Sequence, residues 1–259
     1  MKDCDLKIAP LKGVKKTHTK QPKTEHLPKL PGRWLFCGRS GSGKTLTLQN
    51  MILNKDLYRG CWDYIILMGP TIKMDDQWRL VMDYMERELG QDLHDKEKPC
   101  VIEKFDNDTL VKICDAHEAL VKKVKEKKSE HSIRLPAALI IAEDLADNAE
   151  AVRKSHLLAC YCRCRHINLS VACLSQKYKL LSPVIRLNSS AQFIWAQTED
   201  EANQICMDLS TKYGFKKTFQ IYRACTQEKH SFMLFDALEN TFFKTFEYEV
   251  KTASDPDDS

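Results

Sequence analysis

Residues 34–45 read WLFCGRSGSGKT, and this stretch decides the fold class. Its first four residues are an apolar run whose length and flanks suit a buried strand of a parallel sheet. The next eight, Gly38 to Thr45, satisfy the pattern G-x-x-x-x-G-K-S/T. A helix is expected from Lys44 to Leu53, because apolar residues there recur at helical spacing. Strand, glycine-rich turn and helix in this order predict a loop that binds phosphate groups.

The pattern assigns a role to each residue type in this loop. Glycines let successive backbone N–H groups curl round a β-phosphate at the positive end of the following helix. The lysine reaches the β- and γ-phosphates, and the hydroxyl after it ligates Mg²⁺. Average residue frequencies give roughly a one per cent chance of the pattern in such a chain. We therefore expect ATP and Mg²⁺ as cofactors, held by Gly38, Arg39, Ser40, Gly41, Ser42, Gly43, Lys44 and Thr45.

Outward from this loop, expected strands and helices alternate along the chain. Strands are expected at 64–68, 137–142, 169–174 and 193–196, and helices at 78–85, 110–124 and 201–209. Alternation of this kind predicts an α/β fold with a mainly parallel sheet flanked by helices. Pieces rich in Phe and Tyr at 218–224, 231–235 and 242–248 are expected to add C-terminal β-hairpins.

Polar side chains follow two of the expected strands and are candidates for catalysis. The stretch LIIAEDLAD, Leu139 to Asp147, delivers Glu143 and Asp144 to the carboxyl edge of the sheet. One carboxylate should hold Mg²⁺ and the other should polarise the attacking water, although a strand ending in a charged turn is the alternative. The stretch INLSVACLSQ ends at Gln176, which can touch the γ-phosphate or its water, or can be a loop residue without such a role.

The ends of the chain are unlike its middle. Residues 1–31 carry eight lysines and several prolines, a composition that predicts a disordered basic arm, and residues 252–259 form an acidic tail. Between them we expect an ATPase core at 32–200 and its helix and β-hairpin extension at 201–251. The sequence contains no apolar run of membrane-spanning length and no secretory h-region. Eleven scattered cysteines are typical of reduced, buried thiols in an intracellular protein.

Two further clusters allow more than one interpretation. Cysteines and histidines gather between His156 and His166, but their C-x-C-x-C spacing differs from that of structural zinc knuckles, which argues against a metal. The lysine run at 122–128 could contact DNA phosphates, or could be a solvated helix face. Net charge, at +4, decides neither question.

Four collinear blocks resemble one family. They are the loop after its strand, YIILMGPT with Trp78 downstream, LIIAEDL, and CRHINLSVACLSQKYKLLSPVIRLNSS. Together they are similar to the genome-packaging ATPases of poxviruses, other large DNA viruses, virophages and Polinton-type elements, in the FtsK–HerA division of P-loop motors. The resemblance covers about residues 32–200. It implies a P-loop NTPase fold of the RecA/ASCE type and an ATPase that drives double-stranded DNA translocation into a viral capsid.

The resemblance also implies roles by position. Glu143 falls on the magnesium position and Asp144 on the catalytic-base position, although the family usually has Asp first, so their individual roles stay open. Gln176 matches the sensor. Arg165 matches a candidate arginine finger that completes a neighbouring subunit's site. Arg186 and Asn188 match a pair near the nucleotide, and either arginine could instead make a structural salt bridge.

Partners and location follow from the same resemblance. It implies sequence-independent contacts to double-stranded DNA, a homo-oligomeric ring and a capsid or portal partner, with no membrane partner. Action is expected inside the infected host cell, in the nucleus or a cytoplasmic virus factory, or with the virion. Two other functions remain open: a P-loop nucleotide kinase, and a nucleotide-dependent switch or scaffold with weak turnover. Stimulation of turnover by DNA separates a motor from both.

Overall fold

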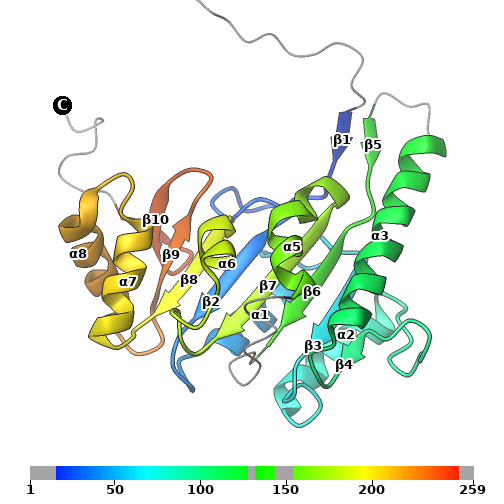
Figure 1. Cartoon of the computed structure of the whole chain (residues 1–259), viewed down its shortest axis with the longest axis horizontal. Coiled ribbons are helices and arrows are strands. Elements are labelled where there is room, and N and C mark those ends of the chain that lie inside the picture. Colours follow the sequence, from blue (N-terminus) through cyan, green and yellow to red (C-terminus); the bar gives the residue numbers. More distant parts are fainter. Residues whose placement is uncertain (1–15, 128–131, 144–154, 251–259) are drawn as a thin grey trace, which may run out of the picture.

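The computed structural model describes residues 16–127, 132–143 and 155–250, and its elements are arranged as in Figure 1. The strands are β1 (Lys16–His18), β2 (Arg33–Cys37), β3 (Tyr64–Met68), β4 (Val101–Ile102), β5 (Ser132–Arg134), β6 (Ala138–Ala142), β7 (Leu169–Ser175), β8 (Ala191–Trp195), β9 (Phe232–Asp236), β10 (Thr241–Lys244) and β11 (Tyr248–Glu249). The helices are α1 (Lys44–Leu53), α2 (Arg79–Arg87), α3 (Asn107–Lys127), α5 (His156–Arg163), α6 (Pro183–Asn188), α7 (Glu199–Leu209) and α8 (Gly214–Thr226), with the short 3₁₀ turns η1 (Asp76–Trp78) and η3 (Cys164–Ile167).

The main sheet of the described residues has nine strands, in the order β11-β10-β9-β8-β2-β7-β6-β3-β4. The six strands from β8 to β4 are parallel, and β9, β10 and β11 extend the sheet antiparallel beyond β8. Strand β7 lies between β2, which leads into the phosphate-binding loop, and β6, which ends before Glu143. The predicted α/β class, with a mainly parallel sheet and added C-terminal strands, is confirmed.

Helices cover both faces of the sheet, because residues along each buried strand alternate between two cores. On β2, Leu35 and Cys37 point into a core formed with α3, α5, α6, α7 and α8, which lie in front of the sheet in Figure 1. Trp34 and Phe36 point into the opposite core, formed with α1 and α2. No helix in the described ranges is long and apolar enough to cross a membrane.

The expectation of a disordered arm over residues 1–31 is wrong for its second half. Strand β1 pairs in parallel with β5, and Leu27 and Leu30 are 4% and 6% exposed in the core that contains α1. The Tyr58 hydroxyl donates to the Pro28 carbonyl at 2.7 Å. Two well-placed leucines therefore anchor a segment whose average composition looks like that of a solvated tail. Residues 1–15 and the acidic tail at 252–259 lie outside the described residues.

The C-terminal extension differs from the prediction at one element. Residues 218–224, expected in a hairpin, belong to helix α8, where Thr218, Ile221, Tyr222 and Cys225 are buried. Their spacing of three and four is helical, and it outweighs the β-propensity of the aromatic residues among them. The expected hairpin is present as β9 and β10, followed by β11, and the expected helix over 201–209 is α7.

Candidate nucleotide-binding site

The phosphate-binding loop joins the carboxyl end of β2 to the start of α1. Gly41 and Gly43 have φ values of 70° and 104°, a region that favours glycine. At Gly38 a Cβ atom would lie 2.6 Å from Ser42 Oγ and 2.8 Å from Trp195 Cβ, so a side chain there would distort the loop. The backbone N–H groups at the start of α1 and the positive end of that helix provide the anion-binding geometry that the motif predicts.

Lys44 lies folded over its own loop. Its Nζ donates to the carbonyl oxygens of Gly38, at 2.7 Å, and Arg39, at 3.0 Å. Beside it is a cavity of about 570 Å³, large enough for a nucleotide. The cavity is lined by the loop, by the first turn of α1 and by Asp75, Gln77, Glu143, Leu174, Ser175, Gln176 and His230.

Glu143, the residue after β6, lines this cavity. Its Oε1 accepts a hydrogen bond from Thr45 Oγ1 at 2.7 Å, although the two residues are 98 positions apart. Its Oε2 accepts from Trp78 Nε1 at 2.6 Å, and the residue is 7% exposed. Gly69 allows the close approach, since a Cβ there would lie 2.7 Å from the Glu143 carbonyl oxygen. Adjacent hydroxyl and carboxylate oxygens are ligands that suit Mg²⁺.

Trp78 is a residue of this site whose role the sequence did not reveal. It is fully buried in η1, and its indole N–H, the sole polar group of the side chain, donates to the Glu143 carboxylate. In the sequence Trp78 lies downstream of YIILMGPT, one of the blocks that carry the family resemblance, but nothing in a lone tryptophan indicates which distant group its N–H contacts. Asp75 and Gln77, which line the cavity beside it, carried no signal either.

His230 is a second unpredicted residue, and it comes from the C-terminal extension. It has a φ of 66°, and its Nδ1 lies 3.3 Å from the Ser42 carbonyl oxygen. The Trp195 indole donates to the His230 carbonyl at 3.1 Å, which holds this turn against the loop. The C-terminal part of the chain therefore contributes to the same cavity as the phosphate-binding loop.

Gln176 reaches the cavity from the end of β7, between the strands that carry the loop and Glu143. Its carbonyl oxygen accepts a long hydrogen bond from Gln197 Nε2 at 3.4 Å. The structure thus gathers Lys44, Thr45, Glu143 and Gln176 at one edge of the sheet, as the sequence predicts. Asp144, the predicted catalytic base, lies outside the described residues.

Arg165, Arg186 and Asn188 lie toward the amino ends of the parallel strands, opposite the phosphate-binding loop. Arg165 is exposed in η3, just before the amino end of β7, whereas the loop follows the carboxyl end of the parallel neighbour β2. It therefore lies away from the nucleotide cavity of its own chain. Its predicted role in a neighbouring subunit stays a prediction.

Asn188 and Arg186 do not line the nucleotide cavity. Helix α6 runs back from the cavity edge, and Asn188 at its end donates from Nδ2 to the Val184 carbonyl at 2.9 Å. Within this chain, its predicted place beside the nucleotide is therefore wrong. Arg186 Nε lies 3.2 Å from Asp208 Oδ2, close but misaligned for a hydrogen bond, and its guanidinium is 5.1 Å from the Tyr178 ring centroid. This favours the structural salt bridge left open above.

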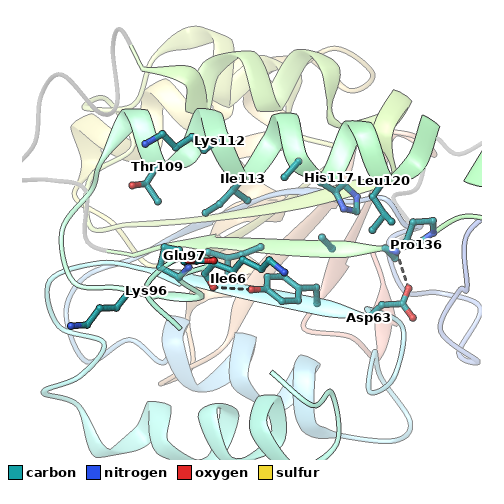
Figure 2. A pocket seen from close by; sticks show the side chains of 16 residues that line it. Asp63, Ile66, Lys96, Glu97, Thr109, Lys112, Ile113, His117, Leu120 and Pro136 are labelled. Carbon is teal, nitrogen blue, oxygen red and sulfur yellow. Dashed lines mark hydrogen bonds between the residues drawn. The ribbon is translucent and has the colours of Figure 1, made fainter. Parts of the chain in front are cut away.

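A second cavity of about 490 Å³ lies between α3 and the amino ends of β3 and β6 (Figure 2). Apolar side chains such as Ile66, Ile113 and Leu120 line it, with Lys96 and Lys112 also among the lining residues. Burial lowers the pKa of His117, whose Nε2 has no hydrogen-bond partner among the described residues. No predicted site residue lines this cavity.

Comparison with known structures identifies the same fold in viral packaging proteins. B204, the DNA-packaging ATPase from Sulfolobus turreted icosahedral virus, matches with a TM-score of 0.56 at 12% identity, over 82% of this chain and 95% of that chain. The genome-packaging NTPase B204 from Sulfolobus turreted icosahedral virus 2, in complex with ATP-gammaS, matches with a TM-score of 0.53 at 14% identity, over 82% and 96%. At such identities the likeness shows the fold alone.

Sequence comparison gives the family. No match was found among curated proteins. The family described as Poxvirus A32 protein matches residues 19–258, which extends on both sides beyond the blocks that carried the resemblance. Because this match spans most of the chain, the chain belongs to the Poxvirus A32 protein family.

Proposed function

We propose that this chain is an ATP-driven double-stranded DNA translocase that packages a viral genome into its capsid. Membership of the A32 family and a fold shared with B204, a DNA-packaging ATPase, support the packaging role. The observation that carries the enzymatic part is Glu143, which accepts hydrogen bonds from Thr45 and Trp78 beside the phosphate-binding loop. An acidic group beside the phosphate-binding loop supports a site for the metal ion that accompanies a nucleoside triphosphate.

The chain's own groups suggest how ATP is held. Backbone N–H groups of the loop bind the β-phosphate, and Lys44 exchanges the carbonyls of Gly38 and Arg39 for phosphate oxygens. Thr45 Oγ1 and Glu143 would hold Mg²⁺, which when bound offsets charge on the β- and γ-phosphates. Asp144 then polarises the attacking water, and Gln176 contacts the γ-phosphate or that water. B204 of the second Sulfolobus virus has been solved with ATP-gammaS, which supports ATP as the ligand here.

DNA contacts should come from basic residues that face phosphates without reading bases. Lys122 and Lys123 are exposed on α3, and Arg163 is exposed at the end of α5. The Lys125 Nζ lies 3.4 Å from the His166 carbonyl oxygen, so the end of α3 and η3 are neighbours. These cations, on α3 and α5 at the ends of the helices opposite the nucleotide cavity, are the proposed contacts to DNA phosphates. A homo-oligomeric ring on a capsid or portal, acting in the infected cell or with the virion, completes the proposal.

ATP turnover with and without duplex DNA, at two salt concentrations, tests this function. Duplex DNA of any sequence should stimulate turnover. If each subunit neutralises about four phosphates, the affinity for DNA should fall roughly 150-fold between 50 and 200 mM salt. An ATP turnover rate that is the same with and without DNA would favour a nucleotide switch or a kinase. Stimulation by one duplex sequence alone, or stimulation insensitive to salt, would also contradict a packaging motor.

A further inference from the structure

Three potential metal ligands converge between α3 and α5, away from the nucleotide cavity. They are Cys114 on α3, and His156 and Cys160 on α5. One ligand atom from each lies within 4.8 Å of the other two, and the two Sγ atoms are 3.4 Å apart. Both cysteines are buried, at 5% and 3% exposure. None of the roles proposed for the ATPase uses these side chains.

The helices hold this cluster in place independently of any ligand. His156 and Cys160 are four residues apart, which puts them on one face of α5. The backbone N–H of His156 donates to Asn107 Oδ1 at 2.7 Å, and this bond fixes the start of α5 to the start of α3. Leu110 and Leu157 pack in the core that these two helices share with the sheet. Ligands presented by two anchored helices form a preorganised site.

We propose that Cys114, His156 and Cys160 bind one Zn²⁺ ion, with water in the fourth position. Two thiolates and an imidazole are a ligand set that zinc accepts. With a Zn–S distance of about 2.3 Å and tetrahedral angles, the two sulfurs should lie about 3.8 Å apart. The observed 3.4 Å needs only a small outward shift of the side chains. A disulfide would require an S–S distance of about 2.05 Å.

The two thiols contact each other directly. Cys114 Sγ and Cys160 Sγ lie 3.4 Å apart, and either thiol can be the donor in this contact. Zinc binds thiolates, so metal binding to this pair should release protons.

The proposed zinc ligands are not the three cysteines of the C-x-C-x-C run. In this run, Cys162 is exposed and Cys164 is buried in η3. Neither belongs to the group of converging ligand atoms that contains Cys160. The partner thiol instead comes from Cys114, 46 residues earlier. A zinc ion here would tie α3 to α5, which is the next described element after Glu143. The three ligands line no part of the nucleotide cavity.

Metal content of the purified full chain, prepared under reducing conditions, tests the site. We expect one zinc per chain by elemental analysis. After zinc removal, titration with Co²⁺ should produce a thiolate-to-cobalt charge-transfer band. Cys114→Ser and Cys160→Ser should each weaken that band, because one of its two thiolates is lost. Each should also lower metal affinity by more than about 10- to 100-fold, the typical cost of losing an outer partner. Cys162→Ser, on the same helix, is the matched control and should keep zinc and band unchanged.

X-ray absorption of the zinc-loaded wild-type chain needs no variant, so it decides the question even if a cysteine variant fails to fold. The expected zinc shell contains two sulfur ligands with nitrogen and oxygen ligands. A shell without sulfur would overturn the proposal. So would absence of zinc and of the cobalt band from reduced wild-type protein, or a band of unchanged intensity and affinity in Cys114→Ser and Cys160→Ser.

Discussion

Replacing Trp78 with Phe removes the donor that holds Glu143 while keeping an aromatic ring in η1. The lost bond is short, 2.6 Å, and it ends on a carboxylate that is 7% exposed. Hydrogen bonds to charged groups contribute about 1.5–3 kcal/mol to stability. Trp78→Phe should therefore lower the free energy of unfolding by about that amount, in addition to the packing lost with the smaller ring.

Trp34→Phe measures that packing loss separately. Trp34 is also fully buried, but its Nε1 has no hydrogen-bond partner among the described residues. The difference between the two variants, measured by denaturant unfolding, should be about 1.5–3 kcal/mol, with Trp78→Phe the less stable.

The same two variants also test whether the Trp78 hydrogen bond contributes to ATP turnover. Without the indole, the Glu143 carboxylate can turn away from Thr45, and ATP turnover should fall about 10- to 100-fold, the range typical for loss of an outer hydrogen-bond partner. Trp34→Phe should keep wild-type turnover. Equal unfolding free energies and equal turnover for the two variants would refute the positioning role of Trp78.

Other substitutions test the remaining roles. Glu143→Gln should raise the magnesium requirement, whereas Asp144→Asn should bind ATP and fail to hydrolyse it; identical behaviour would mean that the assignment by position is wrong. Arg165→Ala should bind ATP normally and hydrolyse it about 10³- to 10⁵-fold more slowly. Mixing this variant with Lys44→Ala should restore part of the activity, and lack of rescue in assemblies shown to be mixed would exclude action in a neighbouring subunit. His230→Ala, which removes a 3.3 Å contact to the Ser42 carbonyl, should raise KM for ATP up to about tenfold with little change in kcat; an unchanged KM would separate this histidine from the site.

The sequence predicts the central sheet well because its parallel strands are buried on both faces. Such strands are short, continuous apolar runs, and Tyr64–Met68 and Ala138–Ala142 are found almost residue for residue. The Poxvirus A32 family match confirms the predicted resemblance. The segment around Leu27 and Leu30 was missed because two buried side chains are too few to change its average composition. Helix α8 was missed because its aromatic residues have strong β-propensity.

The site is predictable where one local motif contains it and unpredictable where distant segments meet. The residues from Gly38 to Thr45 are contiguous, and their types determine the loop conformation, so the loop is predictable from the sequence alone. The contacts from Trp78 to Glu143 and from His230 to Ser42 join residues 65 and 188 positions apart, and depend on the completed fold. Asn188 was misplaced because helix α6 reverses the chain direction between β7 and β8, which carries its end to the opposite edge of the sheet.

Displacement of a third strand from a duplex tests the central claim most directly, because only movement along the DNA strips a bound triplex. Wild-type protein with ATP and Mg²⁺ should displace the third strand from duplexes of unrelated sequence. Lys44→Ala should bind the same duplexes without displacing it, since the phosphate-binding lysine is absent. Wild-type protein that hydrolyses ATP on the DNA yet leaves the triplex intact would contradict an ATP-driven translocase.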